Sequence, residues 1–301
     1  MTELNALIAG LSAANPEISP KYFYDELGSQ IFTAITLLDE YYPPRVEAEI
    51  FASRGMDMAR WLGPVKRLVD IGAADGRKAA KLFKVLGVTE YVGVDISGAF
   101  LQQAITQLGL EHPNVQMTSE VQDFSAGLSL PEGIAHGNLY FYPGSSLGNF
   151  TPEAAVDWLA KLVSADMNGS LLLGIDRVKP KAILDAAYDD AVGVTASFNL
   201  NMLRNVNRVL GSDFDPRQWQ HLGFFNEELS RIEMHLQAKC ELTVNWPGGL
   251  RTFTKGQTIL TECSYKYTAE SIIALLKKAG YSQVEIFSDR HEWFSVVAAR
   301  R

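Results

Sequence analysis

Apolar, β-branched runs alternate with helix-like stretches over the middle of this 301-residue chain. Between the runs, apolar residues recur at helical spacing, as Val156, Leu159 and Val163 do after Thr151. This alternation is typical of a parallel sheet that is covered by helices on both faces, so we predict an α/β fold. The predicted strands lie near residues 67–71, 91–95, 115–119, 139–142 and 170–175.

Capping signals predict two of the helices most clearly. A helix over 151–164 begins with a capping hydroxyl, a proline at the first turn and then an acid. Another helix, over 268–278, is followed by Gly280, a residue typical of helix ends. Strands near 284–287 and 293–299 come next, and we predict that they form an antiparallel pair at the end of the sheet.

The pattern changes after the last of the parallel strands. Residues 180–240 are predicted to be helical, over 181–188, 194–210 and a segment around 227–238. Residues 240–267 are predicted to be strands joined by the turn sequence WPGG.

The first 48 residues are predicted to be a helical lead-in that is rich in aromatics. Pro43 and Pro44 are expected to break it, since adjacent prolines interrupt a helix. A new helix is then expected to lead into the core from about residue 49.

The most informative stretch for chemistry is residues 69–78, VDIGAADGRK, where an apolar strand enters a short turn. Gly72 and Gly76 carry no Cβ, so the backbone of this turn can approach a ligand closely. The next predicted strand ends in a lone carboxylate, Asp95, which sits where a ribose diol would be bound. The pattern therefore predicts a site for a nucleoside cofactor.

The turn favours S-adenosylmethionine over a dinucleotide. It has the spacing G-x-x-x-G instead of G-x-G-x-x-G, and it carries an acid, so it is poorly suited to a pyrophosphate. Asp70 would add negative charge near a cationic ligand, and S-adenosylmethionine is cationic. Asp123 and Phe124 follow a third predicted strand, where they could bind the adenine amino group and cover the adenine ring. Each acid alone could be an ordinary strand-end residue, but all three in this order favour the cofactor.

The composition of the chain limits the kinds of partner and the cellular location that we expect. The net charge is −8 and no basic stripe is present, so nucleic acid is not expected as a partner. No apolar run reaches the length of a membrane span, and no signal peptide is recognisable. The two cysteines, Cys240 and Cys263, form no C-x-x-C pair and suggest a reducing cytoplasm, and the five histidines show no metal-ligand spacing. We expect a cytoplasmic monomer without a metal, in which each histidine is a surface or packing residue.

Five motifs resemble the L-histidine Nα-methyltransferases of ergothioneine biosynthesis, over almost the whole chain. That family trimethylates the α-amine of histidine with three S-adenosylmethionine molecules and no metal, and the resemblance implies the same here. The motifs are KYFYDELGS at 21–29, EYYPPR at 40–45, GSSLGNF at 144–150, FNLNML at 198–203 and TECS at 261–264.

The pattern of predicted elements also indicates a domain organisation. Residues 49–179 and 266–301 are expected to form a Rossmann-like, class I methyltransferase core that binds S-adenosylmethionine. Residues 1–48 and 180–265 are expected to form a second, smaller α+β lobe that binds the substrate.

The resemblance implies roles for individual residues. Asn149 and Tyr188 match residues that hold the substrate carboxylate and amine, and Tyr24 and Tyr41 match tyrosines beside the amine and imidazole; Tyr24 and Asn149 are the expected catalytic pair. Glu262 and Ser264 match the pair that binds the imidazole, and Met234 matches a residue packed near it. The implied cofactor contacts are Gly72, Lys78, Asp95, Asp123 and Phe124.

Each of these residues also has a simpler interpretation. The tyrosines could be core aromatics, and Asn149 could cap the helix that follows it. Glu262 and Ser264 could lie on the solvated face of a strand, and Met234, at helical spacing, could be a packing residue. The cofactor turn also departs from the usual family pattern Gly-Ser-Gly-x-x-x-Lys-Thr, although Lys78 keeps its place.

Two other functions remain open at this point. The same fold could methylate another amino acid or derivative, such as a thiohistidine or a tryptophan-like substrate. Glu262 argues against an indole, which offers a single N–H donor and more bulk. The chain could also be a non-catalytic S-adenosylmethionine-binding protein, against which the intact Tyr24, Asn149 and Tyr188 argue.

Overall fold

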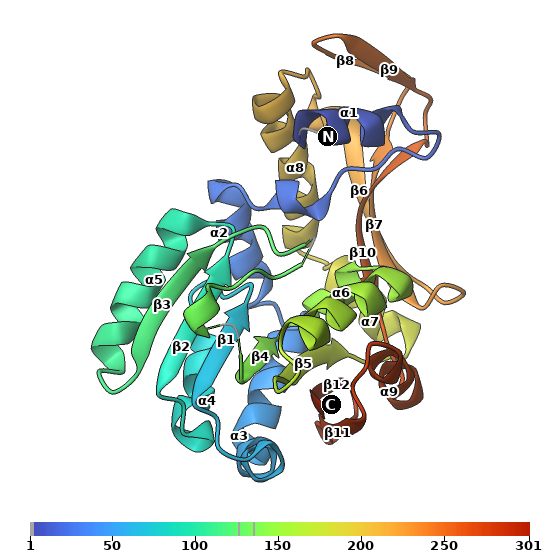
Figure 1. Ribbon diagram of the computed structural model, residues 1–301. Coiled ribbons are helices and arrows are strands. Elements are labelled where there is room, and N and C mark those ends of the chain that lie inside the picture. Colours follow the sequence, from blue (N-terminus) through green and yellow to red (C-terminus); the bar gives the residue numbers. More distant parts are fainter. Residues whose placement is uncertain (1–2, 126, 135) are drawn as a thin grey trace. The chain divides into compact units, whose positions relative to one another are not determined.

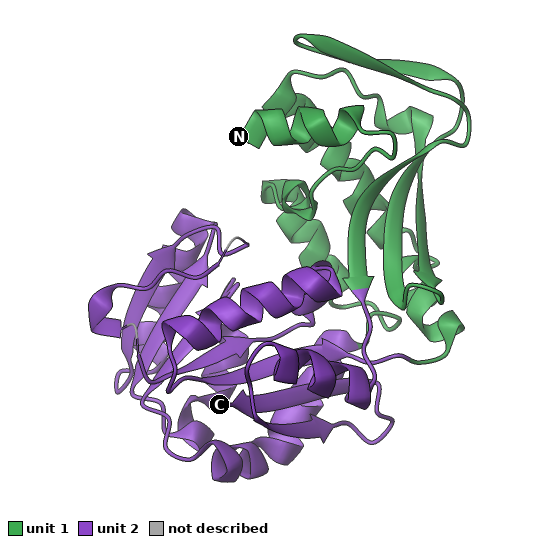
Figure 2. Ribbon diagram, turned by 45° about the vertical axis from the view of Figure 1, so that its right-hand side comes forward, with its two compact units in different colours: residues 1–42, 179–264 green, residues 43–178, 265–301 purple. Residues whose placement is uncertain are grey.

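The computed structural model describes residues 3–125, 127–134 and 136–301, and the chain divides into two compact units (Figure 2). Unit 1 comprises residues 1–42 and 179–264, and unit 2 comprises residues 43–178 and 265–301. Which unit binds the cofactor and which binds the substrate stays a prediction at this stage.

Unit 2 is built on a seven-stranded sheet with the order β11-β12-β5-β4-β1-β2-β3 (Figure 1). Strands β1 to β5 run parallel to one another, whereas β12 runs antiparallel to both β5 and β11. The strand order therefore reverses between β1 and β4, the point at which open α/β sheets bind ligands. The strands are β1 (Arg67–Ile71), β2 (Glu90–Asp95), β3 (Gln116–Val121), β4 (Asn138–Tyr142), β5 (Ser170–Asp176), β11 (Gln283–Ser288) and β12 (Phe294–Arg300).

Helices cover both faces of this sheet, as the apolar runs predicted. Helices α3 (Pro43–Leu62), α4 (Arg77–Leu86) and α5 (Gly98–Glu111) pack on one face, in a cluster that includes Phe141 of β4. Helices α6 (Pro152–Ala165) and α9 (Ala269–Lys278) pack on the other face, with Tyr140 of the same strand. Neighbouring residues of one strand thus enter opposite cores. Two short 3-10 helices, η2 (Glu132–Ile134) and η3 (Ser146–Asn149), lie in the connections.

The proline pair begins a helix instead of ending one. We expected Pro43 and Pro44 to break the lead-in and a helix to start near residue 49, but α3 already starts at Pro43. The physical reason is that the first-turn N–H groups of a helix have no partner within the helix. A missing N–H therefore costs nothing at that position.

Unit 1 combines helices with a three-stranded sheet of order β10-β7-β6 and a separate hairpin of β8 and β9. The N-terminal segment contributes α1 (Glu3–Ser12), η1 (Pro20–Phe23) and α2 (Glu26–Ile35). The second segment contributes α7 (Lys181–Tyr188), α8 (Val194–Leu210), η4 (Pro216–Gln218), β6 (Trp219–Asn226), β7 (Arg231–Ala238), β8 (Leu242–Trp246), β9 (Gly249–Phe253) and β10 (Thr258–Tyr265). Both helices predicted over 181–188 and 194–210 are confirmed.

The helix predicted around 227–238 is wrong, because that segment forms the turn and second strand of the β6–β7 hairpin. Ile232, Met234 and Leu236 are buried at every second position, which is the period of a strand. The sequence already carried this signal, because polar and apolar residues alternate strictly over residues 231–238, RIEMHLQA, and the helix prediction overlooked it. Met234 is therefore a strand residue.

Candidate active site

The turn between β1 and α4 is held tightly at the carboxyl edge of the unit 2 sheet. Gly72 has φ of 72°, and its N–H donates to the carbonyl of Val94 across 2.9 Å. A Cβ on Gly72 would lie 3.4 Å from the ring of Phe124. The backbone at Gly72 is exposed, so a ligand can reach it without meeting a side chain.

Asp95 at the end of β2 fixes this turn as well as facing the expected ribose site. Its Oδ2 accepts from the N–H of Ala74 at 3.0 Å, and its Oδ1 accepts from the N–H of Ser97 at 2.9 Å. Ala74 has φ of 48°, a left-handed conformation that a non-glycine residue rarely adopts. Each carboxylate oxygen has a second lone pair with which it can accept a ribose hydroxyl.

Asp70 contributes less negative charge than the sequence suggested. It is 1% exposed, and burial raises its pKa to about 7, against the opposing effects of the Tyr91 hydrogen bond and the Lys78 charge. The Tyr91 hydroxyl donates to Oδ2 at 2.9 Å, while Oδ1 has no hydrogen-bond partner among the described residues. A buried oxygen in this state is suited to a donor supplied by a ligand.

Asp123 and Phe124 follow β3 at the same edge of the sheet. Asp123 is exposed, and its Oδ1 accepts from the N–H of Ser125 at 2.9 Å. The carbonyl of Phe124 accepts from the indole of Trp158 at 2.7 Å, which fixes the backbone that places the Phe124 ring against Gly72.

Two apolar residues at this edge were not recognised from the sequence as candidate cofactor contacts. Ile96 and Val121 are 55% and 59% exposed, directly after Asp95 and at the end of β3. Large apolar side chains left this exposed beside a polar loop suit the packing of a flat ring such as adenine. Their position immediately after the strand ends is the signal by which they could have been found.

Asn149 lies at the end of η3, in the connection that follows β4. The residue is exposed, and the loop before it begins with Gly144 and Ser145, which both have positive φ. The hydroxyl of Ser145 accepts from the N–H of Asp176 at 2.9 Å. The cap of α6 is Thr151, whose hydroxyl accepts from Ala154, so the capping interpretation of Asn149 is wrong.

Glu47 of α3 is a further residue at this edge that the sequence did not single out. It is 1% exposed, pairs with Lys78 at 2.9 Å and accepts from the N–H of Gly144 at 2.8 Å. The only sequence signal was an acid among the apolar positions of a helix.

In unit 1, ring contacts connect the expected substrate residues into one row. The centroids of Tyr24 and Phe32 are 5.7 Å apart, those of Phe32 and Tyr41 are 6.3 Å apart, and those of Tyr41 and Tyr188 are 5.9 Å apart. The hydroxyls of Tyr188 and Ser264 are 3.4 Å apart, a long hydrogen bond. Both chain segments of unit 1 therefore contribute to this row, which runs from an exposed tyrosine, Tyr24, to a buried serine, Ser264.

Glu262 and Ser264 are alternate residues of β10, so they point to the same face of that strand. Glu262 is half-buried and Ser264 is 3% exposed, so neither lies on a fully solvated face. Met234 of β7 is 2% exposed, and its carbonyl accepts from the hydroxyl of Thr261 at 3.0 Å. Burial of Met234 fits its packing interpretation, and its contact with a ligand stays a prediction.

The backbone of Tyr188 is held by a histidine that we had expected only to pack. The carbonyl of Tyr188 lies 2.8 Å from Nε2 of His221, and Nδ1 of His221 lies 2.8 Å from the side-chain amide of Asn199. Burial lowers the pKa of His221 below its usual value. A Cβ on Gly223 would lie 2.4 Å from the Tyr188 carbonyl oxygen, so β6 needs glycine at that position.

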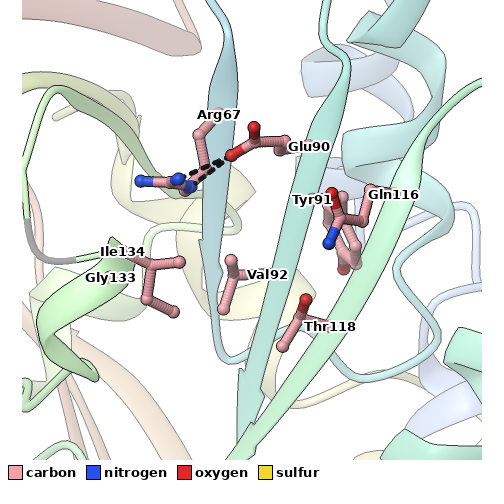
Figure 3. A pocket seen from close by; sticks show the side chains of 8 residues that line it. All are labelled: Arg67, Glu90, Tyr91, Val92, Gln116, Thr118, Gly133 and Ile134. Carbon is pink, nitrogen blue, oxygen red and sulfur yellow. Dashed lines mark hydrogen bonds and ion pairs between the residues drawn. The ribbon is translucent and has the colours of Figure 1, made fainter.

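A cavity of about 230 Å³ lies elsewhere in unit 2 (Figure 3). It is lined by η2 and by residues from the amino-terminal halves of β1, β2 and β3, among which Arg67 and Glu90 form an ion pair at 2.6 Å. The Gly72 turn and Asp95 are at the opposite ends of these strands, so this cavity is not the cofactor site.

The residues at the carboxyl edge fit S-adenosylmethionine better than a phosphate-bearing cofactor. Gly72, Asp95 and the buried oxygen of Asp70 offer close approach and acceptors. Lys78, in the first turn of α4, is already paired with Glu47. Among the described residues, no group of three or more His, Cys, Asp or Glu side chains could hold a metal ion.

A family model described as "Histidine-specific methyltransferase, SAM-dependent" matches residues 4–301. The chain belongs to this family. It is 36% identical over 288 residues to a histidine N-alpha-methyltransferase of Mycolicibacterium smegmatis, covering 93% of this chain and 89% of that protein. It is 34% identical over 308 residues to a histidine N-alpha-methyltransferase of Mycobacterium tuberculosis, covering 97% of this chain and 93% of that protein.

A solved structure has a similar fold. A crystal structure of a possible exported protein from Bordetella parapertussis superposes with a TM-score of 0.50 at 15% identity, covering 92% of this chain and 83% of that chain. The family assignment confirms an S-adenosylmethionine-dependent N-methyltransferase with a Rossmann-like sheet. In the described part of the chain, no helix is long and apolar enough to span a membrane.

Proposed function

We propose that this protein transfers three methyl groups in succession from S-adenosylmethionine to the α-amine of L-histidine, giving Nα,Nα,Nα-trimethylhistidine (hercynine). The observation that carries the proposal is the row of hydroxyl-bearing side chains in unit 1, Tyr24, Tyr41, Tyr188 and Ser264, with Glu262 two residues from the serine. These groups have the chemistry needed to orient an amine and to recognise an imidazole.

The chemistry demands positioning more than proton transfer. Bound S-adenosylmethionine supplies a methyl group on a cationic sulfur, which leaves as a thioether when the nitrogen attacks in line. A fraction of the α-amine is neutral at physiological pH, and the protons that leave the nitrogen before each transfer can pass to solvent, so the protein needs no strong base. Tyr24 and Tyr41 can orient the amine lone pair through their hydroxyls, and placing it about 3 Å from the methyl supplies most of the rate gain.

Uncharged oxygens also suit a product whose positive charge becomes permanent. A carboxylate beside the amine would hold the trimethylated cation in the site. Tyrosine hydroxyls and the amide of Asn149 can give up their amine contacts as methyl groups are added. The loop that carries Asn149 is anchored at Gly144 and Ser145, which keeps this amide in a fixed place within unit 2.

Selectivity for histidine is assigned to Glu262 and Ser264. A carboxylate accepts from an imidazole N–H, and a serine hydroxyl can donate to or accept from the other ring nitrogen. A substrate without those nitrogens would leave the two groups unpaired, which is an effective way of rejecting it.

The oligomeric state, location and partners of the enzyme can be inferred as well. We propose a monomeric, cytoplasmic enzyme that acts on the free amino acid, without a nucleic-acid or membrane partner. The net charge of −8 supports the absence of a nucleic-acid or membrane partner, because polyanions and anionic lipid surfaces repel such a protein. The product would enter ergothioneine synthesis where the host has the later enzymes.

The deciding experiment is the mass of the product. The purified protein is incubated with S-adenosylmethionine and, separately, with histidine, its mono- and dimethyl forms, and tryptophan. We expect trimethylated histidine from all three histidine substrates and no methylated tryptophan. Binding of S-adenosylmethionine without turnover of histidine would refute the proposal, and turnover of tryptophan would favour an indole-like substrate.

A further inference from the structure

Glu47 joins two parts of unit 2 that carry different functions. Its Oε2 lies 2.9 Å from the ammonium of Lys78, in the first turn of the helix that follows the cofactor turn. Its Oε1 accepts from the N–H of Gly144 at 2.8 Å, at the start of the loop that ends in Asn149. One carboxylate therefore contacts both the cofactor side and the Asn149 loop.

The surrounding backbone is shaped to admit this carboxylate. A Cβ on Gly174 of β5 would lie 2.3 Å from Oε1 of Glu47 and 2.8 Å from the backbone nitrogen of Gly144. A Cβ on Gly144 would lie 3.1 Å from the Lys78 ammonium, and Gly144 has φ of 74°. Two glycines thus leave the space that the pair and the loop occupy, and substitution of either would displace them.

The exposure of the two partners is unequal. The side chain of Glu47 is 1% exposed, whereas that of Lys78 is 41% exposed. A buried carboxylate needs a partner to offset its desolvation, so Lys78 is drawn toward Glu47 and away from the many solvated positions that a long side chain can adopt.

We propose that Glu47 is a positioning residue that sets the place of Lys78, neutralises its charge beside a cationic cofactor, and anchors the loop of Asn149. S-adenosylmethionine carries a sulfonium and an ammonium against one carboxylate, so its net charge is positive, and a Lys78 ammonium that Glu47 does not neutralise would weaken its binding. This inference rests on the proposed function for the roles of Lys78 and Asn149. Nothing in it requires Glu47 to touch either substrate.

The two contacts of Glu47 can be separated by substitution. Glu47→Gln keeps an oxygen that accepts from Gly144 but removes the charge that holds Lys78. Glu47→Ala removes both contacts. Lys78→Met removes the other member of the pair, and Glu49→Gln, at an exposed position on the same helix, is the matched control.

The first readout is the dissociation constant of S-adenosylmethionine, measured by calorimetry without any acceptor. We expect Glu47→Gln to raise it about tenfold, since the ammonium of Lys78 then keeps its full charge beside a cationic cofactor. We expect Glu49→Gln to leave it unchanged. In the Lys78→Met background, Glu47→Gln should have little further effect, because Glu47 acts on the cofactor through Lys78.

The second readout is histidine turnover at saturating cofactor. Glu47→Gln should keep kcat within about twofold of the parent, whereas Glu47→Ala should lower kcat about tenfold because the N–H of Gly144 loses its buried acceptor. Circular dichroism and thermal unfolding identify a variant that has not folded. In that case Lys78→Met, at a half-exposed position, still tests the pair.

Two results would overturn the inference. One is a Glu47→Gln protein that binds S-adenosylmethionine as the Glu49→Gln control does. The other is an effect of Glu47→Gln that is as large with methionine at position 78 as with lysine. Failure of the proposed function looks different, because histidine would then stay unmethylated by the parent protein while cofactor affinity still changed with Glu47.

Discussion

The carbonyl oxygen of Tyr188 lies 2.8 Å from Nε2 of His221, within unit 1. A carbonyl only accepts, so Nε2 carries the proton, and Nδ1 accepts from the amide of Asn199. Tyr188 is the last residue of α7, where helix carbonyls lack partners within the helix. The neutral ring of His221 therefore closes the end of the helix and fixes the tyrosine that the family resemblance assigns to the substrate.

This hydrogen bond predicts a specific sensitivity to acid. Burial lowers the pKa of the His221 ring in the folded protein. On acidification the ring is therefore protonated in the unfolded chain, from about pH 6.5 downward, before it is protonated in the folded one. Stability from the neutral ring is fully present above that pH and is lost as the pH falls toward the folded pKa. The melting temperature of the parent should therefore fall more between pH 7.5 and pH 5.5 than that of His221→Gln, which does not titrate. His291→Gln, at an exposed histidine, should behave as the parent does. Equal falls for parent and His221→Gln would show that the ring is not held neutral.

Gly223→Ala should disturb the same tyrosine from the other side. Its Cβ would lie 2.4 Å from the Tyr188 carbonyl oxygen and 2.9 Å from Nε2 of His221, so backbone must shift. We expect a loss of about 1–3 kcal/mol in the free energy of unfolding, measured with denaturant, and a higher KM for histidine. The dissociation constant of S-adenosylmethionine should stay the same.

A control for this substitution is available in unit 2. A Cβ on Gly133 would meet no atom within 4 Å, so Gly133→Ala should be close to neutral in stability and in the KM for histidine. If Gly223→Ala behaves like Gly133→Ala, Tyr188 is not constrained by β6.

The sequence predicted the sheet of unit 2 well because β1, β2, β4 and β5 are short apolar runs with helices of clear period between them. It failed where one pattern fits two structures. The apolar residues Ile232 and Leu236 are four apart, a spacing that suits a helix, but Met234 between them completes a period of two, which the pairing of β7 with β6 confirms. Pro43 was misread for a similar reason, since a proline that stops one helix can equally start the next.

For the site, the sequence identified what is local and missed what is brought together by folding. Gly72 and Asp95 lie in one recognisable strand–turn–helix–strand pattern. Glu47 and Gly144 are 97 residues apart, and no spacing rule connects them. His221 looked like any other packing residue, because its role comes from a carbonyl 33 residues earlier in the chain.

Asp95→Asn should weaken cofactor binding. The carboxylate accepts from the N–H groups of Ala74 and Ser97, and an amide has one acceptor oxygen for these two donors and for a ribose hydroxyl. Loss of charge-assisted hydrogen bonds of about 1.5–3 kcal/mol predicts a dissociation constant for S-adenosylmethionine raised about 10- to 100-fold. Asp75→Asn, at an exposed acid in the same turn, should change it far less. A higher KM for histidine with unchanged cofactor affinity would mean that β2 does not carry the ribose acceptor.

Glu262→Ala should reduce the use of histidine. The loss of an acceptor for the imidazole N–H should lower kcat/KM for histidine by about 1–3 kcal/mol in transition-state free energy, while cofactor affinity stays the same. Glu262→Gln keeps an acceptor of similar shape and should lose less. An unchanged kcat/KM in Glu262→Ala would remove this residue from the substrate site and leave its strand-surface interpretation.

Asn149→Ala should nearly abolish methylation of histidine while leaving the dissociation constant of S-adenosylmethionine intact. The loop before Asn149 is held by Glu47 at Gly144 and by Ser145 at Asp176, and the following helix is capped by Thr151, so the substitution removes an exposed amide without removing a support. Steady-state kinetics with histidine and calorimetry with the cofactor measure the two effects separately. Asn149→Asp provides a second comparison, since its carboxylate would repel the substrate carboxylate and retain the product cation, and turnover should fall even though the shape is kept. If Asn149→Ala turns over histidine at the parent rate, the amide has no part in holding the substrate, and amine orientation rests on the tyrosines of unit 1.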